Sequence, residues 1–170
     1  MAVSRPARVL GLSASIAAGT LAYIIDKKIC HSIHPSLPKF IGLRQEFINI
    51  GQCQSAEEVQ SVLVAAAAAP PVMPSLRLGG HWAFDGGYVD NAPLPTQTVS
   101  EKAATLVLLT RHYPDLPATF VWRGRYYWQP SQKVPVSTWD CTSKTTVEDA
   151  FVLGYEDAQI AIRAGFLRDT

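Results

Sequence analysis

The sequence predicts an α/β fold, and three observations lead to that prediction. The run 105–110 is continuously apolar between polar ends, which is typical of a strand buried on both faces of an α/β sheet. Helical segments that open on capping signals alternate with short strand-like runs. Hydrophobic residues make up 48% of the 170 residues and charged ones 17%. This composition suits a buried sheet or a partly membrane-associated protein, and it excludes disorder for most of the chain.

The charge and the cysteines narrow the class of protein. Lys and Arg number 15 against 14 Asp and Glu, so the formal net charge is +1. A nucleic-acid partner is not expected, because such proteins carry a strong basic excess. Three cysteines without a C-x-x-C pair argue against a disulfide framework and for a reducing compartment. They are Cys30, Cys53 and Cys141.

The N-terminal part combines a basic start, residues 1–8, with an apolar helix expected over 9–28. Val9 to Ile25 holds 17 uncharged residues between basic flanks. Small and hydroxylated residues dilute its hydrophobicity below that of a typical membrane span. Three readings stay open: a buried or interfacial helix, a membrane anchor, or a cleaved signal. The predicted location is therefore cytoplasmic or membrane-associated.

The segment that follows predicts a loop and then a short strand. Cys30-His31-x-x-His34 places metal-type ligands close together, but Pro35 and Pro38 break the segment and no distant ligand pair completes a site. We therefore predict a turn and no metal. The alternation of apolar and polar residues over 46–50 predicts a strand.

The middle of the chain predicts a helix followed by a hairpin. Ser55-x-x-Glu58 is a capping box that opens a helix, and this helix ends in the alanine run before Pro70. Two short runs, 76–78 and 82–84, flank Gly79-Gly80, which predicts a tight β-hairpin. Asp85-Gly86-Gly87 follows at once.

The C-terminal part predicts one more strand and a long helix. Arg125 to Trp128 is aromatic and extended. Thr145-x-x-Glu148 is a second capping box and opens a helix over 145–164. The face expected to pack inward consists of Val147, Ala150, Phe151, Gly154, Tyr155, Ala158, Ala161 and Ile162.

The stretch 65–94, AAAAAPPVMPSLRLGGHWAFDGGYVDNAPL, resembles the patatin-like phospholipase family around its second catalytic motif. There a small-residue helix end, a proline-rich turn and a hairpin precede Asp-Gly-Gly and an Asp-Asn-x-Pro segment. The resemblance is best over 45–111 and extends more weakly to 139–141 and the final helix. It implies a three-layer α/β fold with a mostly parallel sheet between helices. It also implies hydrolysis of lipid acyl esters by a Ser–Asp dyad, a role in lipid degradation, and no cofactor.

Asp85 is the position to which the resemblance assigns the general base. A serine hydroxyl is a weak nucleophile and needs an adjacent base. A carboxylate within hydrogen-bond reach in a low-dielectric pocket can take its proton. Gly86 and Gly87 would let backbone and substrate approach closely. Asp90 and Asn91 are expected to support the loop through hydrogen bonds to the backbone.

The family's nucleophile elbow, G-x-S-x-G, has no full match in this sequence. The nearest string runs from Gly11 to Ser15, with Ser in place of the last Gly, and makes Ser13 a weak nucleophile candidate. Few residues precede it for an oxyanion loop, and its spacing to Asp85 is short for the family. Ser13 is therefore expected to be a small packing residue on the apolar helix.

These observations lead to one main hypothesis and two alternatives. Residues 1–170 are expected to form a single incomplete patatin-like domain, its C-terminal part, which is inactive as an isolated chain. The chain would be a fragment, an isolated segment or a diverged paralogue. The first alternative is a non-catalytic lipid-binding or membrane-associated protein. The second is a half-domain that assembles with a complementary N-terminal half, because the sheet would otherwise have an uncovered edge.

Overall fold

A computed structural model describes residues 1–136 and 144–165. The chain divides into two compact units, Met1–Pro95 and Thr96–Thr170, which are described separately. The described residues form five α-helices and two sheets, so the fold is mixed α/β.

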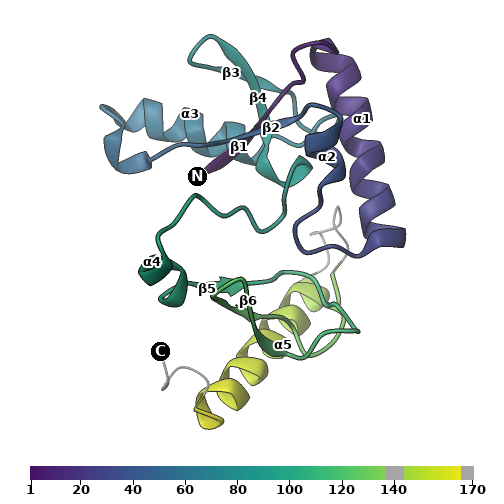
Figure 1. The fold of residues 1–170 in the computed structure, drawn as a ribbon, viewed down its shortest axis with the longest axis vertical. Helices are drawn as coiled ribbons and strands as arrows, with labels where there is room; N and C mark the ends of the chain where they lie inside the picture. Colours follow the sequence, from purple (N-terminus) through teal and green to yellow (C-terminus); the bar gives the residue numbers. More distant parts are fainter. Residues whose placement is uncertain (137–143, 166–170) are drawn as a thin grey trace. The chain divides into compact units, whose positions relative to one another are not determined.

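The first unit is built on a four-stranded sheet of order β2-β1-β4-β3, with every neighbouring pair antiparallel (Figure 1). Short helical turns follow α1, β2 and β4. The strands and helices are β1 (Ala2–Arg5), α1 (Gly11–Ile25), α2 (Leu37–Phe40), β2 (Arg44–Phe47), α3 (Ala56–Ala67), β3 (Leu76–Leu78) and β4 (His81–Asp85).

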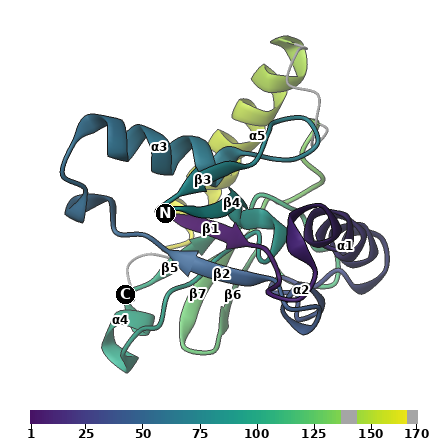
Figure 2. The ribbon, with the colours of Figure 1, turned by 90° about the horizontal axis from the view of Figure 1, so that it is seen from above.

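This sheet lies between α3 and α1 (Figure 2). Successive residues of a strand point to opposite faces, and the core divides accordingly. Val3 of β1 and Ala83 of β4 pack with Ala65 of α3 on one side. Phe84 packs on the other side with Tyr88, and side chains of α1 contact this second cluster.

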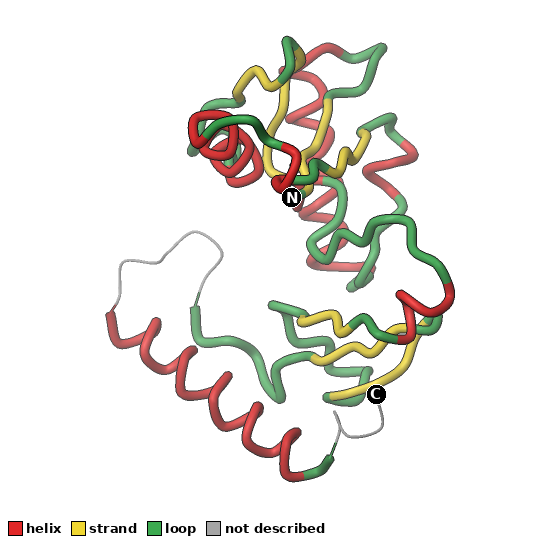
Figure 3. Tube along the Cα trace, turned by 90° about the vertical axis from the view of Figure 1, so that its left-hand side faces the viewer, coloured by secondary structure: helices red, strands yellow, loops and turns green. Residues whose placement is uncertain are grey.

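The second unit holds a three-stranded sheet of order β5-β7-β6. β5 pairs with β7 in parallel, and β6 with β7 antiparallel. Arg123 and Gly124 join β6 to β7 with φ angles of 51° and 77°, as expected for the positive-φ turns of tight hairpins. Figure 3 marks its helices, strands and loops. Its elements are α4 (Val99–Ala103), β5 (Leu106–Leu108), β6 (Thr119–Trp122), β7 (Arg125–Trp128) and α5 (Lys144–Arg163).

The prediction of a mostly parallel sheet is wrong. The four-stranded sheet is antiparallel because Gly79-Gly80 turns β3 straight back into β4, and because β1 runs opposite to both of its neighbours. β1 comes from the basic start, where a strand of four residues gives too weak a pattern to predict from sequence. Among the described pairs, the parallel one is β5 with β7.

Two strand predictions change in detail. The run 105–110 contains β5, but it is buried on one face: Val107 and Leu109 are 7% exposed, whereas Leu108 is 65% exposed. The strand predicted over 46–50 is β2, at 44–47. It ends there because Asn49 caps the next helical turn and accepts a hydrogen bond from the Gly51 amide at 3.0 Å.

The apolar helix predicted over 9–28 is α1, and a π-helical turn, Asp26–Cys30, continues it. Asp26 holds the end of this turn, because its backbone carbonyl accepts from the His31 amide and its carboxylate from the Ser32 amide. None of the described helices combines the length and apolarity needed to cross a membrane.

The other two predicted helices are present as α3 and α5. Ser55 caps α3 by accepting from the Glu58 amide at 3.2 Å. In α5 the predicted face is partly wrong: Phe151 is 74% exposed, whereas Leu153 and Asp157 are buried. A charged residue faces inward there because the Asp157 carboxylate accepts from the Ser131 amide at 2.9 Å. The segment 139–141 lies outside the described residues, as does the side chain of the second capping box, at position 145.

Candidate functional site

The candidate site begins where β4 ends. The register of the sheet places Asp85 opposite Val3, and the Asp85 amide donates to the carbonyl of Ala68 at 2.8 Å. The chain then enters a 3-10 turn, Gly86–Tyr88, which Asp85 caps. Its Oδ1 accepts from the Gly87 amide at 2.7 Å. The carboxylate is thus fixed at the end of a strand by its own local backbone.

Both glycines of this turn are required by close contacts. A Cβ on Gly86 would lie 2.6 Å from the carbonyl oxygen of Ala2, in the neighbouring strand. A Cβ on Gly87 would lie 2.9 Å from Oδ1 of Asn91 and 3.1 Å from Oδ1 of Asp85. A larger residue at position 86 would therefore displace the backbone of β1, and one at position 87 would displace the side chain of Asn91 or of Asp85.

Two polar side chains hold the same turn against the sheet. The Ser4 hydroxyl and the Gln45 amide nitrogen both donate to the carbonyl of Gly86, each at 3.3 Å. Ser4 is fully buried. The turn that carries Asp85 is therefore held from β1 and β2 as well as by its own hydrogen bonds.

The environment of Asp85 favours the protonated acid. Burial raises the pKa of its carboxyl group, and the hydrogen bond from the Gly87 amide partly opposes this shift. A carboxylate with a raised pKa is a better proton acceptor than a fully solvated one. The electrostatics of the position therefore suit a general base.

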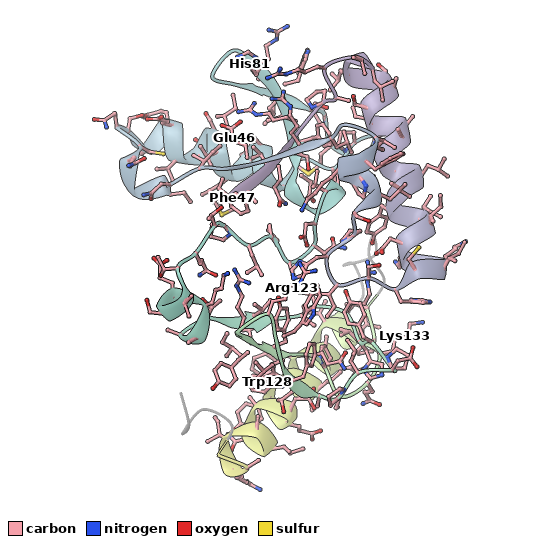
Figure 4. All side chains as sticks on the ribbon, in the orientation of Figure 1. Glu46, Phe47, His81, Arg123, Trp128 and Lys133 are labelled. Atoms are coloured by element: carbon pink, nitrogen blue, oxygen red, sulfur yellow. The ribbon has the colours of Figure 1, made fainter. Side chains whose placement is uncertain are left out.

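Asp85 borders an open cavity of about 500 Å³. Its polar lining comes from Asp85, Asp90 and Asn91, and Figure 4 shows Phe47, another lining residue, on β2. The remaining lining residues are Met1, Ala2, Ala66, Gly86, Gly87, Pro93 and Pro95. The cavity thus combines two carboxyl groups and one amide with an apolar wall.

A histidine that the sequence did not single out for this site joins it from a distant loop. Nδ1 of His34 lies 2.8 Å from Oδ2 of Asp90. Asp90 is only 4% exposed, and its Oδ1 accepts from the Ala92 amide at 2.9 Å. His34 and Asp90 are 56 positions apart, so no local pattern reveals the pair. The sequence predicts only a turn over 30–34 and does not predict the contact between His34 and Asp90.

Tyr88, the last residue of the turn, packs into the core beside Phe84. Its ring meets Phe84 edge-on at 5.1 Å, its hydroxyl donates to the carbonyl of Pro70, and burial raises its pKa. A Cβ on Gly19 of α1 would lie 3.0 Å from the Tyr88 ring. α1 therefore packs closely against the turn that holds Asp85.

Ser13 lies apart from this cavity. It is exposed on the first turn of α1 and is not among the described residues that line the Asp85 cavity. Ser15, two positions later, is fully buried and accepts from the Ala7 amide at 2.9 Å. Of the two serines in this segment, Ser15 is the one that anchors α1 to the chain before it.

Residues 12–96 match the model of the patatin-like phospholipase family. The chain belongs to that family. The match covers half of the chain, includes Ser13 and Asp85, and ends beside the boundary of the first compact unit. Neither the search of curated proteins nor that of solved structures gave a match. The patatin-like phospholipases are a family of lipid acyl hydrolases.

Within the described residues of this family member, no three His, Cys, Asp or Glu side chains are grouped to hold a metal ion. Cys30 is exposed, and His31 adopts a left-handed conformation with φ 49° that ends the π-helical turn.

Proposed function

We propose that the first unit is the base-bearing part of a lipid acyl hydrolase, with Asp85 as the proton acceptor of a Ser–Asp dyad. The observation that carries the proposal is the Asp85 carboxylate, which is partly buried, has a raised pKa and borders a cavity with an apolar wall. Asp90 and Asn91 would keep the loop that follows in place.

The chemistry assigned to Asp85 is proton transfer. Its Oδ1 accepts from the Gly87 amide, which leaves Oδ2 to take the hydroxyl proton of a serine. The serine oxygen then attacks the acyl carbonyl carbon, the ester C–O bond breaks, and the alcohol leaves with the proton that Asp85 returns. Water hydrolyses the acyl-serine by the same proton path in reverse.

We also propose that this chain is one incomplete domain and inactive on its own, because Ser13 lies outside the Asp85 cavity. Its assembly with a complementary half would supply the nucleophile. In the described sheet β2 and β3 are edge strands, and unpaired strand edges are sites where further chain can add.

Ester hydrolysis by the whole chain tests this proposal. The chain alone should hydrolyse a short-chain p-nitrophenyl ester no faster than the buffer. Added to an N-terminal patatin-like half that carries G-x-S-x-G, it should yield activity that Asp85→Asn lowers by a factor of 100 or more. Asp115→Asn removes an exposed carboxylate of the second unit and is the control. Hydrolysis by the chain alone that Ser13→Ala abolishes would instead make Ser13 the nucleophile.

A second candidate function is lipid binding without catalysis, and the surface around α1 and α2 supports it. Leu21 is 59%, Ile29 73% and Phe40 88% exposed. Lys27, Lys28 and Lys39 belong to the same helical segments. Exposed apolar side chains beside lysines are typical of proteins that lie on an anionic lipid surface.

Co-sedimentation with vesicles separates this candidate from the first. Substituting Ile29→Ser and Phe40→Ser should abolish binding to anionic vesicles if the surface touches lipid. Val121→Ser, which removes a side chain that is 63% exposed in the second unit, should leave binding unchanged. A wild-type chain that stays in the supernatant would exclude the second candidate.

A further inference from the structure

A second cavity of the first unit lies at the other end of the same sheet. It has a volume of about 480 Å³ and is lined by charged or titratable side chains: Arg5, Arg8, Arg44, Glu46 and His81. β1 runs from one cavity to the other, since Ala2 lines the Asp85 cavity and Arg5 lines this one. The two cavities share no lining residue.

The sheet itself brings these charges together. The β1–β2 register places Arg5 directly opposite Arg44, and like charges opposite each other in a sheet are destabilising. Figure 4 shows His81 and Glu46 on the strands that flank β1. The fold therefore assembles several cations at one sheet end, where the pairing pattern alone would disfavour them.

Arg5 is held in place by hydrogen bonds within the sheet. The side chain of Arg5 is 8% exposed, and its Nε donates to Glu46 Oε2 at 2.7 Å. One terminal nitrogen of Arg5 also lies within 3.3 Å of three carbonyl oxygens in the β3–β4 hairpin. The hydrogen bond from Arg5 lowers the pKa of Glu46, and the charges of Arg5, Arg44 and His81 lower it further. Glu46 thus compensates Arg5 and helps fix it as a rigid wall.

The other two arginines keep their donors available. The side chains of Arg8 and Arg44 are exposed, and no hydrogen bond joins either guanidinium group to another described residue. With His81 neutral, three guanidinium groups and one carboxylate leave the cavity a formal charge of +2. Planar guanidinium forks match the oxygens of phosphate groups and bind them in pairs of hydrogen bonds.

We propose that this cavity, the arginine cavity, binds a phosphate group between Arg8 and Arg44, with His81 at its rim. Every side chain that lines this cavity is charged or titratable, which favours a charged polar occupant over an acyl chain. The phosphate belongs either to a lipid headgroup or to a soluble ion, since both present the same oxygens. This inference does not depend on the proposed hydrolase role, because the arginine cavity is separate from Asp85.

The test is calorimetric titration of the whole chain with inorganic phosphate at constant ionic strength, alongside flotation with vesicles of phosphatidylcholine with or without phosphatidic acid. Arg8→Gln and Arg44→Gln should each lower affinity roughly ten-fold or more, the loss expected for a charge-assisted hydrogen bond. Arg8 lies outside the strands, so its substitution keeps the test valid if Arg44→Gln disturbs β2. The single substitutions Arg123→Gln and Arg163→Gln in the second unit form the charge-matched control pair, because each also removes one positive charge.

Each outcome decides the proposal. Binding of inorganic phosphate that Arg8→Gln weakens supports it with a soluble source. Binding confined to vesicles with phosphatidic acid, and weakened by the same variant, supports it with a headgroup source. Absence of binding to both probes, or equal weakening by the control pair, would overturn it. Ester hydrolysis is not measured, so failure here leaves the role of Asp85 as it was.

Discussion

The two compact units use their buried polar groups differently. In the first unit the Asp85 carboxylate borders an open cavity of about 500 Å³ and has a raised pKa. The second unit has a smaller cavity, about 260 Å³, beside α5. Its acidic lining residue, Asp157, accepts a hydrogen bond from the Ser131 amide. The family match, residues 12–96, covers most of the first unit and ends beside the boundary with the second.

Gln129 shows the same difference in a neutral side chain. It is 2% exposed and accepts from the Tyr113 amide at 2.5 Å. Its own amide nitrogen lies within 3.0 Å of three backbone carbonyls, those of Tyr113, Leu116 and Pro117. The second unit thus uses a buried polar side chain to join loops, whereas the first unit places a partly buried carboxylate at the edge of its cavity. A titratable group with a shifted pKa that borders a cavity is a candidate for a functional role.

The largest expected effect is that of Gln129→Leu. Leucine would leave the Tyr113 amide and the carbonyls around it without partners in a buried place, which costs about 3 kcal/mol. Amide hydrogen exchange followed by mass spectrometry should show lost protection in β5 to β7 with β1 and β4 unchanged. Gln132→Leu, at an exposed position nearby, is the control. Equal loss of amide protection in both units would show that Gln129 does not stabilise the second unit alone.

Gly86→Ala probes the first unit in turn. The added methyl would lie 2.6 Å from the Ala2 carbonyl, and relieving such a contact costs about 2 kcal/mol. Urea denaturation should show the loss, and hydrogen exchange should locate it in β1 and β4. Gly154→Ala is the matched control, because a Cβ there meets no atom within 4 Å. It lies within α5, so it should raise stability by about 0.5–1 kcal/mol; a loss of similar size in both variants would contradict the steric explanation.

Each unit has a histidine whose ring forms a hydrogen bond within the fold, and the two bonds can be compared. His34 in the first unit contacts the buried carboxylate of Asp90, and His112 in the second contacts the carbonyl of Pro130, both at 2.8 Å. Because hydrogen bonds to charged groups are stronger, His34→Ala should cost about 2 kcal/mol and His112→Ala about 1 kcal/mol. Thermal unfolding of the two variants at one pH measures the difference. A larger loss for His112→Ala would mean that the Asp90 pair does not hold its loop.

The smallest expected effect is a pH dependence centred on Asp85. Burial raises its folded pKa above the ordinary aspartate value of 3.8, so the folded state binds more protons than the unfolded state between these two pKa values. Stability therefore falls as the pH rises from about 3.8 through the folded pKa. Asp85→Asn keeps the acceptor for the Gly87 amide and removes the charge, so it should be more stable than wild type at neutral pH.

Denaturant titrations at pH 7 and pH 3.5 would check this prediction. The stability gained by Asp85→Asn should shrink at the lower pH, because the carboxyl group of folded wild type is then protonated and, like asparagine, uncharged. A constant difference at both pH values would mean that ionisation of Asp85 carries no cost. The result bears on the comparison of the two units, because it measures the free energy of unfolding that the first unit loses by holding an ionised carboxylate at its cavity.

Much of the local structure could be predicted from neighbouring residues. Gly79-Gly80 produced the hairpin, Ser55 capped α3, and the prolines at 70 and 71 followed its end. These features depend on backbone preferences and hydrogen bonds within a few positions, which a sequence displays directly. Asp85 at the end of β4 follows from the same hairpin. The family match confirms the resemblance to the patatin-like phospholipases, whereas the roles within the stretch 65–94 stay predictions.

Only the tertiary structure decided how distant segments pair. β1 between β2 and β4, His34 against Asp90, and Arg5 opposite Arg44 join positions that are 39 or more residues apart. A short strand gains its stability from its neighbours, so β1 left no clear pattern of its own, and the direction of the sheet could not be deduced. The sequence by itself determined the turns, the helix ends and the place of Asp85. Packing between remote strands decided the antiparallel sheet and both cavities, because long-range contacts are set by burial of whole faces rather than by local preference.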